Sequence, residues 1–363
     1  MGFIVPNRQH RKCSQQFPGP GRKQQPKAPY APDNNYMSSL AATATSVIAP
    51  PAVVLPPARS LERRAVAATL HCLSVDVEEY FQCEVFAGAI PRSDWTRLER
   101  RARPALELIA ELLARHRCRA TFFVLGWLVE RLAPLLRELR AAGHEIACHG
   151  YAHEHLARLS PRDLAEDLRR ARSVIEDVLG LRPRGYRAPT FSVTRRTAWA
   201  LDVIAAAGFH YDSSIFPVRH DRYGVPDAPL LPFRVVAPGG ARLLEFPPLT
   251  LDAGLLRLPL GGGGYLRLLP EALFHRALQH RQRRGQPTML YLHPWELDPD
   301  QPTPAIGRLS RWRHRVNLEK TAGKLERLLE RFTFDTAANV LQCVVQQGAL
   351  PEFTLAADVT TSK

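Results

Sequence analysis

The stretch GHEIACHGYAHEHLARLSPRDLAEDLRRARSVIEDVLG, residues 143–180, holds one strand, one loop and one helix in succession. EIAC (145–148) is predicted as a short strand. A helix is expected to begin after Ser160, because Ser160, Pro161 and Asp163 match an N-cap, a first-turn proline and the acid of a capping box. Apolar residues then recur at steps of four and three, at Leu164, Leu168, Ala171, Ile175 and Val178. One face of this helix is therefore predicted to be buried.

The same alternation of short strand and amphipathic helix continues on both sides of this stretch. The strand candidates are residues 70–75, 120–125, 145–148, 184–188, 209–214, 243–247 and 288–293. Glycines follow several of the intervening helices, where a left-handed residue is useful: Gly143, Gly180, Gly208 and Gly285. Seven such units predict an α/β barrel at residues 69–300. An amphipathic helix at 317–332 is expected within a C-terminal helical extension, residues 301–350.

Residues 1–68 are rich in Pro, Gln, Ser and Ala and are predicted to form a disordered or extended leader, with Met37 as an alternative start. No apolar run approaches the roughly 20 residues that cross a bilayer. The Ala-rich stretch after Met37 has only part of the pattern of a signal peptide. A cytoplasmic protein without a transmembrane segment is therefore expected.

The composition is that of an ordinary globular protein, with 45% hydrophobic and 23% charged residues. The net charge of +14 comes with a general preference for arginine, which supplies 43 of the 49 basic residues. No nucleic-acid-binding motif accompanies it, so specific nucleic-acid binding is not expected. The six cysteines show no CxxC pair, which predicts reduced thiols. The run Gly261–Gly264 lacks the Lys-Ser/Thr of a phosphate-binding loop and is expected to form a flexible loop.

Chemically capable side chains follow the predicted strands: Asp76, Glu78, His149, His153, Arg187, Asp212, His293 and Trp295. The carboxyl ends of barrel strands are where active sites are assembled. His149 and His153 can converge on one metal ion. With 13 histidines in 363 residues, roughly 0.5 such pairs arise by chance, so the spacing alone is weak evidence.

Asp76 and Glu78 lie two residues apart, so an extended strand presents both carboxylates on one side. One can ligate a metal while the other accepts a proton. Glu79 points to the other face and is expected to be a solvated turn residue.

Six motifs in order resemble those of the polysaccharide deacetylase (NodB-homology) family. They are DVE (76–78), ATFFVLG (120–126), GHEIACHGYAH (143–153), GYRAPTFS (185–192), YDSSIFP (211–217) and YLHPWELDP (291–299). The chain looks closest to the deacetylases of exosortase and exopolysaccharide gene clusters, which share segments similar to HDRYGVP (220–226) and GGGYLRLLP (262–270).

This resemblance implies a distorted (β/α)7 barrel that holds a divalent metal with an Asp-His-His set. Asp76 matches the general base, and His149 and His153 match the metal ligands. Many relatives have two adjacent aspartates where Val77 follows Asp76 here. Glu78 is the candidate third ligand, or Asp76 serves both roles. Zinc is the expected metal, and iron, cobalt or nickel would accept the same ligands.

The remaining roles also come from the resemblance. Arg187 would pair with Asp76, and His293 would protonate the departing amine while Asp212 or Asp298 orients it. The substrate-binding candidates are Tyr151, Pro189, Thr190 and Trp295. Among them, the Thr190 region would supply a backbone N–H to the oxyanion, and Trp295 would stack on a sugar or belong to the core.

The implied activity is removal of N-acetyl groups from amino sugars of a polysaccharide or its precursor, in exopolysaccharide biosynthesis. An N-acetylated glycan is the expected partner. Two alternatives remain open at this point. The same fold also hydrolyses small non-sugar amides or imides. A basic glycan-binding protein that has lost its metal would share the sequence pattern without the chemistry.

Overall fold

The computed structural model describes residues 70–220, 222–254 and 256–357, which belong to one compact unit. The leader predicted at residues 1–68 lies outside the described residues. All seven predicted strands form, and they lie parallel in the order β10, β1, β2, β3, β4, β5, β7. Their bounds are β1 (His71–Val77), β2 (Thr121–Val124), β3 (Glu145–Cys148), β4 (Gly185–Tyr186), β5 (Tyr211–Asp212), β7 (Arg242–Glu245) and β10 (Met289–Leu292).

The two edge strands of this parallel array, β7 and β10, meet just beyond the end of β7. Pro248 forms a parallel bridge with Met289, and the Leu249 N–H donates to the Met289 carbonyl at 2.8 Å. The sheet therefore closes on itself, which confirms the predicted barrel. In the described part of the chain a single β-bridge joins the two edges of the sheet, and β4 and β5 are only two residues long. The barrel is therefore distorted.

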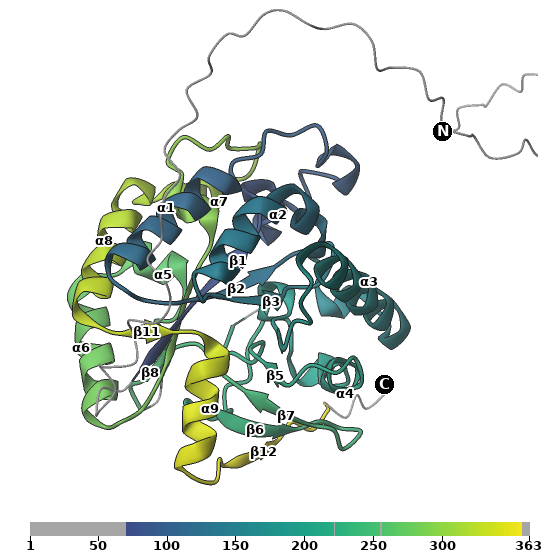
Figure 1. The fold of residues 1–363 in the computed structure, drawn as a ribbon, viewed down its shortest axis with the longest axis vertical. Helices are drawn as coiled ribbons and strands as arrows, with labels where there is room; N and C mark the ends of the chain where they lie inside the picture. The colour runs from purple at the N-terminus through teal and green to yellow at the C-terminus, as the bar shows by residue number, and fades with distance from the viewer. Residues whose placement is uncertain (1–69, 221, 255, 358–363) are drawn as a thin grey trace, which may run out of the picture. The chain divides into compact units, whose positions relative to one another are not determined.

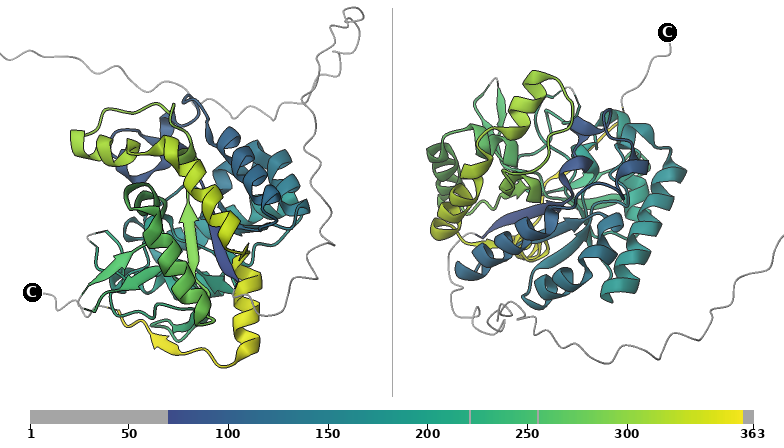
Figure 2. Two further views of the ribbon diagram at one scale, coloured as in Figure 1. Left: turned by 90° about the vertical axis from the view of Figure 1, so that its left-hand side faces the viewer. Right: turned by 90° about the horizontal axis from the view of Figure 1, so that it is seen from above.

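Helices cover the outside of the barrel (Figure 1). Their bounds are α1 (Ala102–Arg115), α2 (Gly126–Ala141), α3 (Pro161–Leu179), α4 (Ala200–Ala206), α5 (Gly263–Leu268), α6 (Glu271–Arg283), α7 (Arg308–Arg315), α8 (Leu318–Arg331) and α9 (Ala337–Gln347). Helices α8, α1, α2, α3 and α4 pack in that order. Figure 2 shows α6 and α8 side by side, where Arg327 and Glu271 form an ion pair at 2.6 Å. The division between barrel and extension near residue 300 stays a prediction.

Helix α3 begins and ends as predicted. The Ser160 hydroxyl accepts from the Asp163 N–H at 3.2 Å, and the Asp163 carboxylate accepts from the Ser160 N–H at 3.1 Å. Gly180 ends the helix with φ 61°. The buried face matches the predicted spacing except at its last position, where Leu179 is buried in place of Val178. Local capping and periodicity were sufficient to define this element.

Several strands were not predicted: β6 (Phe233–Val236), β8 (Thr250–Asp252), β9 (Arg257–Pro259), β11 (Phe334–Asp335) and β12 (Glu352–Thr354). β6 runs antiparallel to β7, and β12 pairs with β6, so both extend the sheet beyond the barrel. β8 and β9 form a separate hairpin. These strands are two to four residues long, so their formation depends on a partner strand and gives little periodic signal.

The expectation of a flexible loop at Gly261–Gly264 is wrong. Gly261, Gly262 and Gly263 are buried, and Gly263 and Gly264 begin helix α5. A Cβ at Gly262 would lie 2.3 Å from the Tyr291 hydroxyl, so the absence of a side chain permits close packing. These glycines therefore allow neighbouring groups to pack closely against the backbone.

Among the described residues, every helix is too short or too polar to cross a bilayer. The described cysteines, at positions 72, 83, 118, 148 and 343, are all free thiols, as predicted.

Candidate active site

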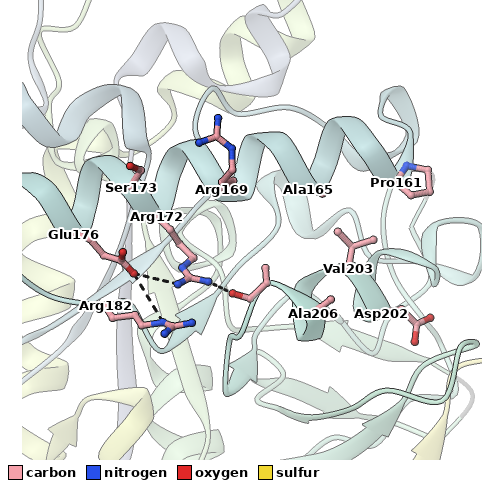
Figure 3. Close-up of a pocket in the computed structure, with 11 residues that line it drawn as sticks. Pro161, Ala165, Arg169, Arg172, Ser173, Glu176, Arg182, Asp202, Val203 and Ala206 are labelled. Carbon is pink, nitrogen blue, oxygen red and sulfur yellow. Dashed lines mark hydrogen bonds and ion pairs between the residues drawn. The ribbon is translucent and has the colours of Figure 1, made fainter.

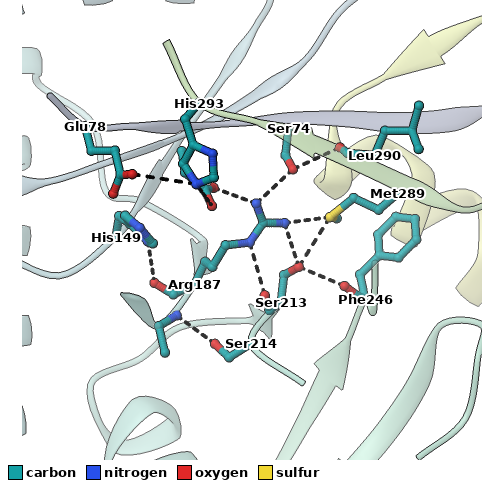
Figure 4. Close-up of polar contacts among 12 residues, drawn as sticks. Ser74, Glu78, His149, Arg187, Ser213, Ser214, Phe246, Met289, Leu290 and His293 are labelled. Atoms are coloured by element: carbon teal, nitrogen blue, oxygen red, sulfur yellow. Dashed lines mark hydrogen bonds and ion pairs between the residues drawn. The ribbon is translucent and has the colours of Figure 1, made fainter. Parts of the chain in front are cut away.

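Four strands deliver polar side chains to one end of the barrel (Figure 4). Asp76 lies near the carboxyl end of β1, and His149, Arg187 and His293 directly follow β3, β4 and β10. Because these strands are parallel neighbours, their carboxyl ends meet at the same edge. The structure thus brings together residues that are more than 200 positions apart in the sequence.

Glu78, His149 and His153 form a cluster whose potential ligand atoms all lie within 4.8 Å of one another. The three side chains are buried. The Glu78 Oε2 and His153 Nε2 atoms are 2.8 Å apart. The Nδ1 atom of His149 contacts the Arg187 carbonyl at 2.8 Å, which leaves Nε2 as its ligating nitrogen. This is the grouping predicted for a metal site.

The loop that carries both histidines is held in an unusual backbone conformation. Gly150 has φ 77° and His153 has φ 53°. The Asp167 carboxylate of α3 accepts from the Tyr151 N–H at 2.9 Å, and the Gly126 N–H donates to the Gly150 carbonyl at 2.8 Å. A non-glycine residue at positive φ is costly and is often found at functional sites. These bonds hold His153 where it faces Glu78.

The cluster fits a divalent cation. Glu78 Oε2 is buried and lacks a hydrogen bond, because its close contact with His153 does not have hydrogen-bond geometry. Burial raises the pKa of Glu78, but His153 and His293 outweigh this effect, so the pKa is lowered to about 2. Burial lowers the pKa of His149 to about 4. An ionised carboxylate and a neutral imidazole are the forms that bind metals such as zinc.

Arg187 is fully buried and contacts Asp76 directly. Its Nη1 donates to Asp76 Oδ1 at 2.6 Å and to the Ser74 hydroxyl at 2.9 Å. Its Nε donates to the Ser213 carbonyl at 3.1 Å, and its guanidinium lies 4.1 Å from the ring centroid of Phe123. The predicted pairing of Arg187 with Asp76 is therefore present. It holds the carboxylate in one orientation.

His293 faces both carboxylates of the first motif. Its Nε2 lies 3.6 Å from Glu78 Oε1 and 3.9 Å from Asp76 Oδ2. Burial lowers the pKa of His293, but Glu78, Glu296 and Asp76 outweigh this effect and raise the pKa to about 9. A protonated imidazole beside the metal ligands can act as a general acid.

The expected orientation of His293 by Asp212 or Asp298 is wrong. Asp212 is fully buried and accepts from the Ser214 hydroxyl at 2.6 Å, and Asp298 pairs with Arg101 at 2.5 Å. Glu296 contacts the His293 Nδ1 instead, at 3.1 Å. Asp212 is the last residue of β5, and Asp298 follows the 3₁₀ turn after β10. Only the tertiary structure showed that both carboxylates bond to groups other than His293.

Trp295 belongs to the core and not to a sugar-stacking surface. Its ring is 7% exposed and stacks on both His293 and His314, with centroids 5.0 and 4.7 Å away. Its indole N–H donates to Glu78 Oε1 at 2.9 Å. The structure thus favours the second of the two roles predicted for Trp295, a place in the core, where its hydrogen bond orients a candidate metal ligand.

The remaining substrate-binding candidates lie on two loops. The Tyr151 ring lies against Arg170, whose guanidinium is 3.6 Å from the ring centroid. Pro189 begins a short 3₁₀ turn, Pro189–Phe191, in which Thr190 and Phe191 have φ 58° and 51°. The Ser214 hydroxyl accepts from the Ala188 N–H at 2.8 Å and so supports the start of this turn. Substrate contact by these residues stays a prediction.

The expectation that Glu79 is a solvated turn residue is wrong. It is 2% exposed, and its Oε2 accepts from the backbone N–H groups of Arg101 and Ala102 at 2.7 and 3.0 Å. These N–H groups lie at the start of α1, where an acceptor is required. Glu79 therefore anchors this helix next to the site.

A cavity of about 710 Å³ lies between α3 and α4 (Figure 3). Its lining includes Arg169, Arg172 and Asp202 and shares no residue with the candidate site. Arg172 pairs with Glu176 on the same helix and donates to the Ala207 carbonyl at the end of α4. This cavity lies between two helices, whereas the candidate catalytic and metal-binding residues lie at the carboxyl ends of the barrel strands.

The arrangement defines a class: an α/β barrel with a His/carboxylate centre at the carboxyl ends of its strands. Residues 101–211 match the family model described as Polysaccharide deacetylase, and residues 213–342 match a Domain of unknown function (DUF3473). Residues 101–211 are therefore similar to the polysaccharide deacetylases. His149, His153 and Arg187 lie in the first matched segment, and His293 lies in the second.

Two curated relatives and one solved structure are similar to parts of this chain. A chitooligosaccharide deacetylase of Bradyrhizobium sp. (strain ANU 289) is 32% identical over 152 residues, which are 39% of this chain and 64% of that protein. A peptidoglycan deacetylase of Helicobacter pylori is 28% identical over 107 residues, 30% of this chain and 36% of that protein. The chain thus spans less than two thirds of either relative. The crystal structure of a Mycobacterium smegmatis protein assigned to the polysaccharide deacetylases shares the fold, with a TM-score of 0.52, 20% identity, and coverage of 82% of this chain and 98% of that one.

Proposed function

We propose that this protein is a metal-dependent hydrolase that removes N-acetyl groups from amino sugars of a polysaccharide or its precursor. The observation that carries the proposal is the convergence of the Glu78, His149 and His153 cluster with Asp76 and His293 at one barrel end. Similarity to chitooligosaccharide and peptidoglycan deacetylases supports an N-acetylated glycan as the substrate. The resemblance of the downstream segments supports a role in exopolysaccharide biosynthesis.

Glu78, His149 and His153 would hold the metal, with zinc as the expected ion. A divalent metal on such ligands supplies Lewis-acid polarisation of a carbonyl and lowers the pKa of a bound water. Glu78 is the better third ligand, because Asp76 lies outside the cluster and is engaged by Arg187. Trp295 keeps the Glu78 carboxylate in place through its indole N–H.

Asp76 accepts the proton of the attacking water at a carboxylate oxygen. Arg187 leaves Asp76 Oδ2 available because it contacts the other oxygen, Oδ1. His293 Nε2 lies next to Oδ2 and can pass a proton to the departing amine. The Thr190 N–H stands at the start of a turn and, among the described contacts, donates to no protein acceptor. It is a suitable donor to the developing oxyanion.

The test couples metal analysis to an acetate-release assay on N-acetylhexosamine oligomers. Wild-type protein is expected to bind about one metal per chain and release acetate, and Asp76→Asn is expected to keep the metal but lose most activity. His149→Ala should lose both. Unchanged acetate release in both variants would contradict the proposal. The cytoplasmic location expected from the sequence stays a prediction.

A further inference from the structure

We infer that Glu296 and Arg267 are a positioning pair that fixes the ring orientation and the protonated nitrogen of His293. The inference rests on the proposed function, because it gives His293 its direction toward the reaction centre. It also gives a role to the segment 213–342, which contains both residues and is described only as a domain of unknown function.

Glu296 contacts His293 twice. Its Oε2 accepts from the His293 backbone N–H at 3.0 Å and contacts Nδ1 of the ring at 3.1 Å. The Glu296 side chain is fully buried. Glu296 is the third residue of the 3₁₀ turn Pro294–Leu297, which begins directly after His293. The same carboxylate oxygen therefore contacts both the backbone N–H and the ring of His293.

Arg267 neutralises this buried carboxylate. Its Nε donates to Glu296 Oε1 at 2.9 Å, and the arginine itself is 4% exposed. Its Nη1 donates to the carbonyls of Arg313, His314 and Val316 at 3.1, 2.9 and 3.2 Å. These carbonyls end helix α7, where the orphan acceptors of a helix terminus favour a cation. The pair is therefore anchored to α7 as well as to the His293 turn.

The consequence for His293 follows from the nature of the acceptor. An ionised carboxylate only accepts hydrogen bonds, so Nδ1 carries a proton whenever it contacts Glu296. Nε2 is then the nitrogen that exchanges a proton with substrate. It is this atom that lies 3.9 Å from Asp76 Oδ2 and 3.6 Å from Glu78 Oε1.

Gly263 provides the space for the carboxylate. A Cβ at this position would lie 1.5 Å from Glu296 Oε2 and 2.5 Å from Oε1. At the next residue, Gly264, the nearest atom to such a Cβ is 3.9 Å away. Neither glycine has a positive φ, so alanine fits the backbone at both positions. The two substitutions add the same methyl group to the same helix, and only one displaces Glu296.

The experiment compares Gly263→Ala with Gly264→Ala in the full chain. We expect Gly263→Ala to lower kcat for acetate release about 10- to 100-fold, the range typical of a metal-bound histidine that loses the partner orienting it. KM should stay within about twofold, since the substrate contacts are not altered. Gly264→Ala should match wild type in both constants. Glu296→Gln, which keeps the shape but not the charge, should reproduce the loss in kcat.

A double variant separates displacement of Glu296 from general damage to α5. Gly263→Ala combined with Glu296→Ala should be no slower than Glu296→Ala alone, because the carboxylate that the methyl displaces is already gone. Additive losses in kcat would overturn the inference. So would equal kcat values for Gly263→Ala and wild type.

A spectroscopic measurement tests the pair even if a variant fails to fold. In wild-type protein labelled with ¹⁵N-histidine, long-range proton–nitrogen spectra recorded as the pH is raised should show His293 losing its Nε2 proton and keeping its Nδ1 proton. The His293 signals are identified by their loss in His293→Gln. An unprotonated Nδ1 would overturn the inference without touching the proposed function. Conversely, full activity of Asp76→Asn and His149→Ala would reject the proposed function and leave this spectrum unchanged.

Discussion

Nη1 of Arg187 donates to Oδ1 of Asp76 at 2.6 Å in the interior of the barrel, where neither side chain is more than 3% exposed. The arginine also donates hydrogen bonds to the hydroxyls of Ser74 and Ser213 (Figure 4). Through Arg187 the carboxylate is therefore connected to β1, β4 and the segment after β5. The candidate base therefore depends on a buried charge pair for its position.

Arg187→Met is expected to destabilise the protein by about 3–5 kcal/mol, because it leaves the Asp76 charge buried without its partner. Urea unfolding measures the change. Arg103→Ala is the control, since Arg103 and its partner Glu107 are 61% and 45% exposed. An exposed pair of this kind contributes about 0–1 kcal/mol. Equal losses for the two variants would refute a special role for the buried pair.

His149→Ala is expected to reduce metal affinity at least about tenfold, as the loss of one of three protein ligands should do. His155→Ala is a matched control on the same loop. His155 lies outside the cluster. Its Nδ1 accepts from the Ala157 N–H at 3.2 Å, and its Nε2 contacts the Arg222 carbonyl at 3.4 Å. The measurement is zinc binding in competition with a chromogenic chelator. Similar zinc affinities for the two variants would argue against the Glu78–His149–His153 site.

The buried carboxyl groups of Asp212 and Glu245 are expected to make stability fall as the pH rises. Both are fully buried and lie opposite each other in the β5–β7 register. Burial raises the pKa of Asp212 to about 6. Burial also raises the pKa of Glu245 well above its usual value, and the nearby charge of Asp212 raises it further. The folded state thus keeps protons that the unfolded chain releases above its ordinary carboxyl pKa of about 4.

Each such proton lowers the free energy of unfolding by about 1.4 kcal/mol per pH unit between the unfolded and folded pKa values. Glu245→Gln removes one titrating group, so its stability relative to wild type should increase from pH 4 to pH 7. Urea unfolding of both proteins across this range provides the test. A constant difference between them would show that the pair does not hold an extra proton.

Glu79→Ala is expected to cost about 1–3 kcal/mol, because two N–H groups at the start of α1, one part-buried and one buried, lose their acceptor. Glu99→Ala is the control, since Glu99 is 59% exposed and pairs with Arg101 at the surface. Thermal unfolding distinguishes the two. If Glu79→Ala were as stable as the control variant, water would have to replace the lost acceptor.

The parallel strands and α3 were predictable because their signals are local. Ser160 and Gly180 mark the ends of α3, and the spacing of Leu164 and Leu168 marks its buried face. The short strands β6 and β12 carry no comparable signal, because each forms only against a neighbour that the rest of the fold supplies.

The sequence also contained a signal for the partner of His293 that was not used. Glu296 follows His293 by three residues, the spacing of a capping box, and the contact is local. Arg267 gave no such signal, because it reaches Glu296 from a helix 29 positions away. A search for acids three residues after a candidate catalytic histidine would have found the first residue and not the second.

The sequence alone determined which chemical groups stand at the ends of which strands, because hydrophobic periodicity and strand order follow from local residue patterns. It therefore identified Asp76, Glu78, His149, His153, Arg187 and His293 before any contact was known. The resemblance to a known family also predicted that Arg187 pairs with Asp76, and this contact is present. Only the tertiary structure decided the partners of the other two groups, Trp295 for Glu78 and Glu296 for His293. Which side chains become partners depends on distances across the barrel and on which buried hydrogen-bond donors still need an acceptor. Local periodicity encodes neither of these.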